Sequence, residues 1–405
     1  MKKYLGAAVS DLAFMFMALL FMVLLFTVSS CCAAAASAGA QDDAAWEESE
    51  GDALLFADSV AEYMDIAEIE ESLSEMTATK EFSFWGTVKA FLTGELPFSA
   101  ETLTETAAEL FLGELKEQKQ LAVQILLVAF LSAVFSNFVR VFESHQISDI
   151  SFFMMYLMLS ALLMNSFSAL TEMVSDTCSS LNTFMKILLP SYVITIVASA
   201  GTVTALGFYE ITLLAVGLLQ SVILKVVLPA VHIYMLVLLL SQLSDGDVFS
   251  RSAALLETLI SWGVRSLVGI VVGLQAVQCL TAPAYDALKN SSISRVASVI
   301  PGVGSVLNAA AETVLGSAVV LKNAVGAAGI LALGMICLTP LIKLLVCILL
   351  FRFLCAIIAP ICEKRMVDGI ETISKGSVLL LRVMGASLAV FVISLAMIMA
   401  SIRSG

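Results

Sequence analysis

The pattern of apolar residues changes near residue 120. Beyond that point apolar residues gather into eight blocks, most of them about 20 residues long or longer. A helix of about 20 apolar residues crosses the hydrocarbon layer of a bilayer, which is about 30 Å thick. The blocks lie at 120–142, 150–171, 187–209, 211–243, 259–281, 302–321, 324–361 and 376–402. The pattern therefore predicts an all-α, polytopic membrane protein with about seven to nine transmembrane helices.

Two of the blocks are too long for one simple crossing. At 1.5 Å per residue, 211–243 would be about 50 Å long and 324–361 about 57 Å. Each contains a proline, Pro229 in the first and Pro340 in the second. Because proline lacks the backbone N–H and clashes with the preceding turn, we expect helix breaks at these positions.

The prolines also indicate an internal duplication. Pro190 and Pro301 are separated by 111 residues, the same distance that separates Pro229 from Pro340. Two further matches follow after a small insertion. They pair Glu257 with Glu371 and Arg265 with Arg382. The predicted units are about 187–282 and 298–402, with helix breaks expected at all four prolines.

The relative orientation of these units depends on how often each crosses the membrane. If each crosses three times, the units are inverted, as in many secondary transporters. The stretch 244–258 holds three acidic residues against one arginine, whereas 362–375 holds Lys364, Arg365 and Lys375. The positive-inside rule then places the first stretch outside and the second inside. If each long block is instead two crossings, the units are parallel and this assignment fails.

Composition supports a membrane domain and isolates one acidic segment. Hydrophobic residues make up 60% of the chain and charged residues only 14%, against about 25% charged in soluble domains. The net charge is -13, but 41–120 holds 20 acidic and 4 basic residues, whereas 121–405 has a net charge of +2. This acidic segment argues against nucleic acid or anionic lipid as its partner and favours a basic partner or a solvated spacer.

The first 38 residues have the pattern of a secretory signal. Lys2 and Lys3 precede an apolar run over 12–28, and a small-residue cleavage site follows at 36–38. An uncleaved anchor is one alternative, and a lipoprotein signal ending at Cys31 is another. All three place residue 41 onward outside the cytoplasm. The predicted domains are a signal peptide at 1–38, an acidic extracytoplasmic helical segment at 39–119 and a transmembrane domain at 120–405.

Two helices are expected within the acidic segment. Apolar residues recur at helical spacing over 53–76 among acidic ones, which is typical of an amphipathic helix. Such a helix covers either its own membrane domain or a partner. The stretch 82–98, with Trp85, has the aromatic composition of an interfacial helix.

Ionisable residues inside the apolar blocks are candidates for a polar path. Each costs about 2.5 to 3.5 kcal/mol on insertion scales, so each needs either a function or a local partner. His232 and Lys343 are equivalent under the repeat, three residues after Pro229 and Pro340. The alternatives are a satisfied pair, such as Glu312 with Lys322, or a snorkelling side chain. The full set is His232, Lys343, Glu312, Lys322, Lys225, Glu210 and Arg352.

Small residues and cysteines give weaker signals. Gly269 and Gly273 form a GxxxG motif, which serves close packing within the chain or between subunits. Cys178 and Cys362 are the cysteines of the mature chain expected near loops.

The sequence holds no phosphate-binding loop, HExxH or GxSxG motif, and no CxxC spacing. We therefore expect no catalytic residue, metal site or cofactor and interpret the chain as non-enzymatic.

Three stretches resemble the stage III sporulation protein AE family of endospore-forming bacteria. They are FLTGELPFSAETLTETAAELFLGELKEQKQLAVQILLVAFLSAVFSNF at 91–138, MKILLPSYVITIVASA at 185–200 and IPGVGSVLNAAAETVLGSAVVLKNAVGAAGI at 300–330. The resemblance implies a component of a multi-protein channel or secretion-like complex in the mother-cell membrane facing the forespore. It also implies, as partners, the other stage III sporulation A proteins and the forespore stage II sporulation protein Q.

Two other functions compete with this interpretation. One is a self-sufficient secondary transporter whose site lies between the two broken helices. The other is a membrane scaffold without a pore. For any of the three functions, a homo-oligomer within a larger complex is a further possible partner arrangement. Substituting the polar-path residues and the GxxxG glycines distinguishes these functions.

Overall fold

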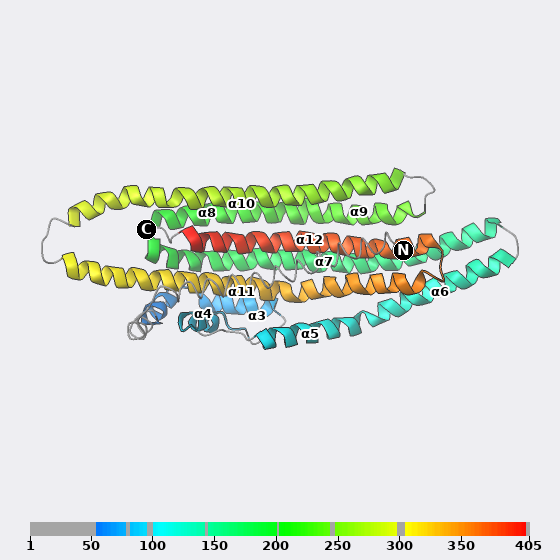
Figure 1. The fold of residues 1–405 in the computed structure, drawn as a ribbon, viewed down its shortest axis with the longest axis horizontal. Helices are drawn as coiled ribbons and strands as arrows, with labels where there is room; N and C mark the ends of the chain where they lie inside the picture. The colour runs from blue at the N-terminus through cyan, green and yellow to red at the C-terminus, as the bar shows by residue number, and fades with distance from the viewer. Residues whose placement is uncertain are drawn as a thin grey trace.

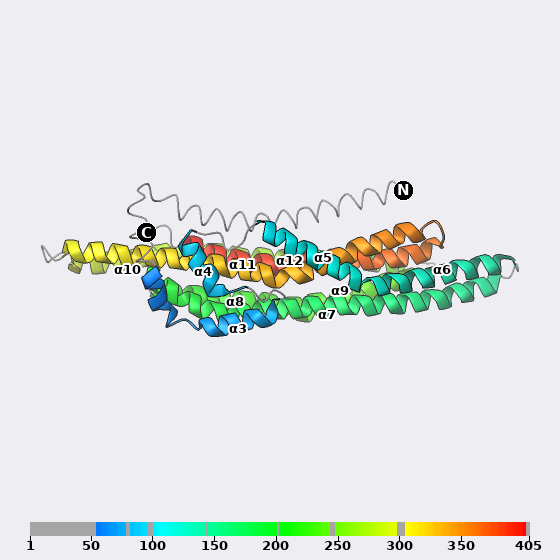
Figure 2. The same ribbon diagram turned by 90° about the horizontal axis from the view of Figure 1, so that it is seen from below.

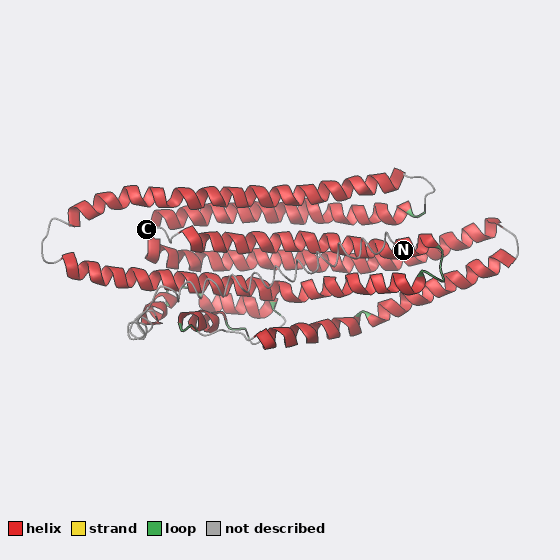
Figure 3. Cartoon of the chain, in the orientation of Figure 1, coloured by secondary structure: helices red, strands yellow, loops and turns green. Residues whose placement is uncertain are grey.

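The computed structural model describes residues 54–77, 82–94, 100–141, 145–200, 202–243, 248–297 and 304–401. Within these residues every regular element is helical (Figure 3). The long helices run side by side along one axis (Figure 1). The all-α prediction is therefore confirmed. The predicted signal at 1–38 lies outside the described residues.

Seven α-helices and one π-helix form the bundle. They are α6 (Lys119–Val141), α7 (His145–Ala200), α8 (Thr202–Val222), η1 (Ile223–Val227), α9 (Leu228–Ser241), α10 (Val248–Ala297), α11 (Gly304–Ile358) and α12 (Lys364–Ser401). Among the described residues, six helical stretches are long and apolar enough to cross a membrane. The blocks 150–171 and 187–209 were expected to be separate, but most of both belongs to α7, which continues through the polar residues between them.

The helix breaks expected at the prolines do not occur in the described part of the chain. Pro190 lies within α7 and Pro340 within α11. Pro229 is the second residue of α9, which begins directly after η1 in a helical stretch that continues from α8. The wider turn of a π-helix relieves the clash between a proline ring and the preceding turn, so the helix continues. Pro301 lies outside the described residues.

The two units predicted as repeats each contribute one long helical hairpin. The first consists of α8, η1 and α9 followed by α10, and the second consists of α11 followed by α12. Both hairpins turn at the same end of the bundle (Figure 1). The structure therefore favours the parallel alternative over the inverted one, because the two hairpins run in the same direction. The placement of 244–258 and 362–375 on opposite sides of the membrane belongs to the inverted alternative.

Cysteine labelling in intact cells checks this arrangement. We expect Gln242→Cys and Lys364→Cys, each in a Cys362→Ser background, to show the same accessibility to a membrane-impermeant maleimide. The reason is that both positions adjoin a hairpin turn at one end of the bundle. Labelling of one position and protection of the other would restore the inverted arrangement.

The centre of the bundle is α12, which packs against α7, α8, α9, α10 and α11. The apolar segment of α12 is mostly buried, whereas that of α10 is mostly exposed. Figure 1 shows α12 between the first hairpin and α11. The second hairpin thus supplies the core helix, whereas α10 lies at the periphery.

The N-terminal helices form an arm that lies along one side of the bundle (Figure 2). The arm consists of a short helix at 54–61, α3 (Ile66–Met76), α4 (Phe84–Leu92) and α5 (Ala100–Glu117). Helix α3 packs on α7, while α4 and α5 pack on α11.

The apolar side of the arm faces its own chain, as the amphipathic pattern allowed. Ile69 and Leu73 are buried in the common core. The predicted helix at 53–76 is interrupted at 62–65, so it forms two pieces. The predicted interfacial helix corresponds to α4, whose Phe84 and Val88 are also buried in that core. Ser83 caps α4 and donates a 2.8 Å hydrogen bond to Glu70 Oε1, which ties α4 to α3.

Candidate functional site

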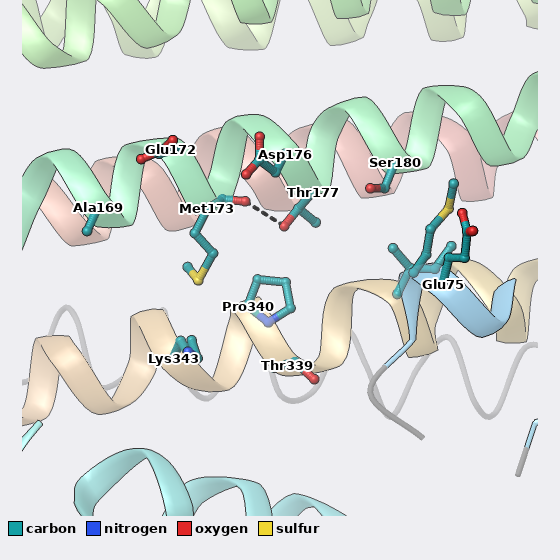
Figure 4. A pocket seen from close by; sticks show the side chains of 12 residues that line it. Glu75, Ala169, Glu172, Met173, Asp176, Thr177, Ser180, Thr339, Pro340 and Lys343 are labelled. Carbon is teal, nitrogen blue, oxygen red and sulfur yellow. Dashed lines mark hydrogen bonds between the residues drawn. The ribbon is translucent and has the colours of Figure 1, made fainter. Parts of the chain in front are cut away.

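An acidic groove lies between α3, α7 and α11 (Figure 4). Its volume is about 710 Å³, within the range of small-ligand and side-chain binding sites. Its charged lining residues are Glu75, Glu172, Asp176 and Lys343. The groove thus combines the N-terminal arm with two bundle helices that are distant in sequence.

The carboxylates of the groove come from two elements. Glu172 and Asp176 are four residues apart on α7, so they lie one turn apart on the same face. Glu75 lies near the end of α3. All three side chains are exposed. In the described part of the chain, none of the three carboxylates has an ion pair within 4 Å.

Lys343, on the α11 wall beside Pro340, is neutralised from the arm. Its Nζ lies 3.3 Å from Glu114 Oε2 and 3.6 Å from Glu117 Oε2. The Glu114 side chain is only 5% exposed. Gln118 Nε2 donates a 3.0 Å hydrogen bond to its other oxygen. Lys343 therefore anchors α5 to α11, and the remaining groove carries a net negative charge.

Two other predicted polar-path residues bind the central helix. Lys322 is 1% exposed, and its Nζ donates a 2.9 Å hydrogen bond to the carbonyl oxygen of Met399 in α12. Arg352 Nε donates a 3.2 Å hydrogen bond to Ser374 Oγ, also in α12. Both side chains therefore connect α11 to α12. The expected partner of Lys322, Glu312, has a side chain outside the described residues.

The remaining predicted residues are dispersed. His232 is half-buried, with its ring centre 6.1 Å from that of Phe167. Lys225 and Glu210 are exposed. Of the predicted polar-path residues whose side chains are described, only Lys343 lines the acidic groove.

The close packing contacts lie at glycines other than the predicted pair. Gly269 and Gly273 have no atom within 4 Å of the position that a Cβ would take. A Cβ on Gly376 would lie 2.6 Å from Phe167 Cε2, and one on Gly329 would lie 2.8 Å from Leu188 Cδ2. The helices therefore approach closely at Gly329 and Gly376, on α11 and α12, whereas the GxxxG face of α10 is open.

The two cysteines expected near loops differ in their surroundings. Cys178 is fully buried in α7, because the loop expected between two spans does not exist. Cys362 does lie in the turn between α11 and α12, and its Sγ donates a hydrogen bond of 3.2 Å to the carbonyl oxygen of Ala129. Burial, and to a smaller extent Glu363, raises the pKa of the Cys362 thiol.

The carboxylates of the groove are not arranged as metal ligands. Over the described ranges, no group of three or more His, Cys, Asp or Glu side chains is placed to hold a metal ion. Exposed carboxylates around an open groove suit a basic side chain better than a dehydrated cation.

The sequence matches one known protein family over most of its length. The sequence profile described as Stage III sporulation protein AE matches residues 82–402. The Stage III sporulation protein AE of Bacillus subtilis (strain 168) is 24% identical over 357 residues, covering 82% of this chain and 89% of that relative. No solved structure shows a significant match. Because the profile covers the arm from α4 onward and the whole helical bundle, the chain belongs to the stage III sporulation protein AE family.

Proposed function

We propose that this protein is a non-enzymatic membrane component of a multi-protein sporulation channel or secretion-like complex that links mother cell and forespore and is needed for late forespore development. Its partners are the other stage III sporulation A proteins and the forespore stage II sporulation protein Q. The protein spans the mother-cell membrane, and its N-terminal arm lies outside the cytoplasm. The family supports the sporulation role, and the six long apolar helices support the membrane location.

The observation that carries the partner role is the acidic groove. Lys343, its cation, is already paired with Glu114 and Glu117 of the arm. The carboxylates of Glu75, Glu172 and Asp176 remain available along one open cavity. A basic segment of a partner complements this charge, and complementary charges of this kind set specificity and association rate.

The fold affects the two alternative functions, the secondary transporter and the scaffold, differently. A secondary transporter with a site between broken helices loses its structural basis, because α11 and the stretch from α8 to α9 continue through their prolines. A scaffold without a pore uses the same groove for the same partners. The channel component and the scaffold therefore share the partner-binding step that the groove is proposed to perform.

Neutralising the groove tests this step. In sporulating cells, we expect the triple variant Glu75→Gln, Glu172→Gln, Asp176→Asn to reduce co-purification of the partner proteins roughly 10-fold, because three exposed ion pairs contribute about 0.2 to 1 kcal/mol each. Spore yield should fall with it. The protein level and the melting temperature should remain unchanged, since all three side chains are exposed.

A matched control removes the same charge elsewhere on the arm. Glu62, Glu68 and Glu71 are exposed and lie outside the groove. Their triple Gln variant should retain the partners and the spore yield. Equal loss in both triple variants would mean that only the total charge of the protein matters, and no loss in either would remove the groove from the function.

A further inference from the structure

Two buried glutamines join the first hairpin to the central helix. Gln220 on α8 is 1% exposed and Gln275 on α10 is 3% exposed. Ser387 Oγ of α12 donates a 3.0 Å hydrogen bond to Gln220 Oε1, and Gln275 Nε2 donates to Ser394 Oγ. We call these four residues the amide seam. It lies where the two hairpins meet.

The seam follows one face of α12. Ser387 and Ser394 are seven residues apart, which is two helical turns and about 10 Å along the axis. Helices α8 and α10 both pack against α12 and against each other. The four polar side chains therefore form a short line inside an otherwise apolar part of the bundle.

Each glutamine has hydrogen-bonding capacity that the chain leaves unused. Gln275 Oε1, an acceptor, is buried without a hydrogen-bond partner, and Gln220 Nε2, a donor, has only the weakly accepting sulfur of Cys178 beside it. A buried polar atom without a partner costs about 1–3 kcal/mol, whereas a leucine of similar volume costs nothing of this kind. Packing alone therefore does not account for these two residues, and a small molecule that both donates and accepts would complete both amides.

The surroundings of the seam are neutral. The Cys178 thiol of α7 lies beside both Gln220 and Ser387. On the same two hairpin helices, Lys225 and Arg265 have exposed side chains. A charged molecule in the seam would lack a counter-charge, and burying an unpaired ion is far more costly than burying a dipole.

We propose that the amide seam binds water and small uncharged polar molecules and forms a hydrated track between the two hairpins. The track runs along α12, past Gln220 and Gln275, and not through the dispersed ionisable residues of the apolar blocks. What the cell uses the track for rests on the proposed channel function, but its hydration does not. The test distinguishes this role from a purely structural one, in which the same residues fix the register of the two hairpins.

Alkylation of the native cysteines by iodoacetamide, a small uncharged polar reagent, tests the proposal in the full chain in native membranes. Cys178 adjoins the seam, and Cys347 is equally buried but contacts Ser377 instead. We expect Cys178 to be alkylated at least about 10-fold faster than Cys347, since thiolate formation needs water. Peptide mass spectrometry measures both rates in one sample. Equal rates would overturn the proposal without any variant being made.

Gln220→Leu then separates hydration from packing. We expect this variant to slow alkylation of Cys178 to the rate of Cys347 while the melting temperature stays equal or rises. A lowered melting temperature would show that Gln220 is a packing residue and would also overturn the proposal. Because neither measurement involves partner recovery or spore yield, failure here is distinguishable from failure of the acidic groove as a partner site.

Discussion

Replacing Gly376 by leucine is expected to destabilise the folded bundle by about 3 kcal/mol, because a larger side chain overpacks a closely packed site. A Cβ at this position would lie 2.6 Å from Phe167 Cε2 and 3.1 Å from Met235 Sδ. The Phe167 ring is fully buried beside His232, so it has little freedom to move away. Helices α7, α9 and α12 meet at this point, and a larger side chain on α12 must separate them.

Thermal melting of the purified protein in detergent measures the effect. Gly273→Leu on α10 is the matched control, because nothing lies within 4 Å of its Cβ position. The control should leave the melting temperature unchanged or raise it slightly, since leucine favours a helix over glycine by about 0.8 kcal/mol. If Gly376→Leu melts together with Gly273→Leu, the close approach of α12 to Phe167 is wrong.

The sequence predicted the class of the fold but not the lengths of its helices. Apolar blocks identify segments that suit lipid, but the ends of a block are not the ends of a helix. In α7 the polar stretch between two blocks includes Glu172 and Asp176, yet the helix continues. These two side chains lie on the face of α7 that lines the acidic groove, so they need no loop to reach it. Hydropathy indicates whether a segment suits lipid or water, but it does not indicate where a helix begins or ends.

The prolines show the same limit for local signals. Proline is the residue type expected at a helix break, but packing on neighbouring helices keeps the stretches around Pro229 and Pro340 helical. A π-helix before Pro229 absorbs the local misfit. No local pattern in the apolar residues near Pro229 distinguishes a π-helix from a break, so the helix break predicted there was wrong.

The candidate site was predicted in part. Lys343 was singled out because a cation in an apolar block needs a partner, and it has two. Those partners, Glu114 and Glu117, lie in the acidic segment. Acidic residues are frequent there, so the sequence does not indicate which of them pairs with Lys343. The amide seam was missed because glutamine and serine carry no charge, although Ser387 and Ser394 share the seven-residue spacing of one helix face.

Replacing Lys343 by methionine is expected to loosen the N-terminal arm by about 2 kcal/mol, the cost of leaving the Glu114 carboxylate buried without its cation. That side chain is 5% exposed, and the remaining hydrogen bond from Gln118 satisfies only one of its oxygens. Since 1.4 kcal/mol is a factor of ten, the population of the opened arm should rise about 30-fold. Local opening of this kind exposes backbone to proteases while the bundle remains folded.

Limited proteolysis of the full chain in membranes measures this opening as the rate of cleavage within the arm. Lys375→Met is the matched control. Its ion pair with Glu371, at 3.3 Å, links adjacent turns of α12 with the lysine side chain 52% exposed, so its loss should leave the cleavage rate unchanged. The double variant Lys343→Met, Glu114→Gln should return most of the protection, because removing the carboxylate removes the buried charge that opens the arm. Cleavage that is equally slow in all four proteins would mean that apolar contacts of α3 and α4 hold the arm alone. A double variant as open as Lys343→Met would show that the lysine acts through a contact other than Glu114.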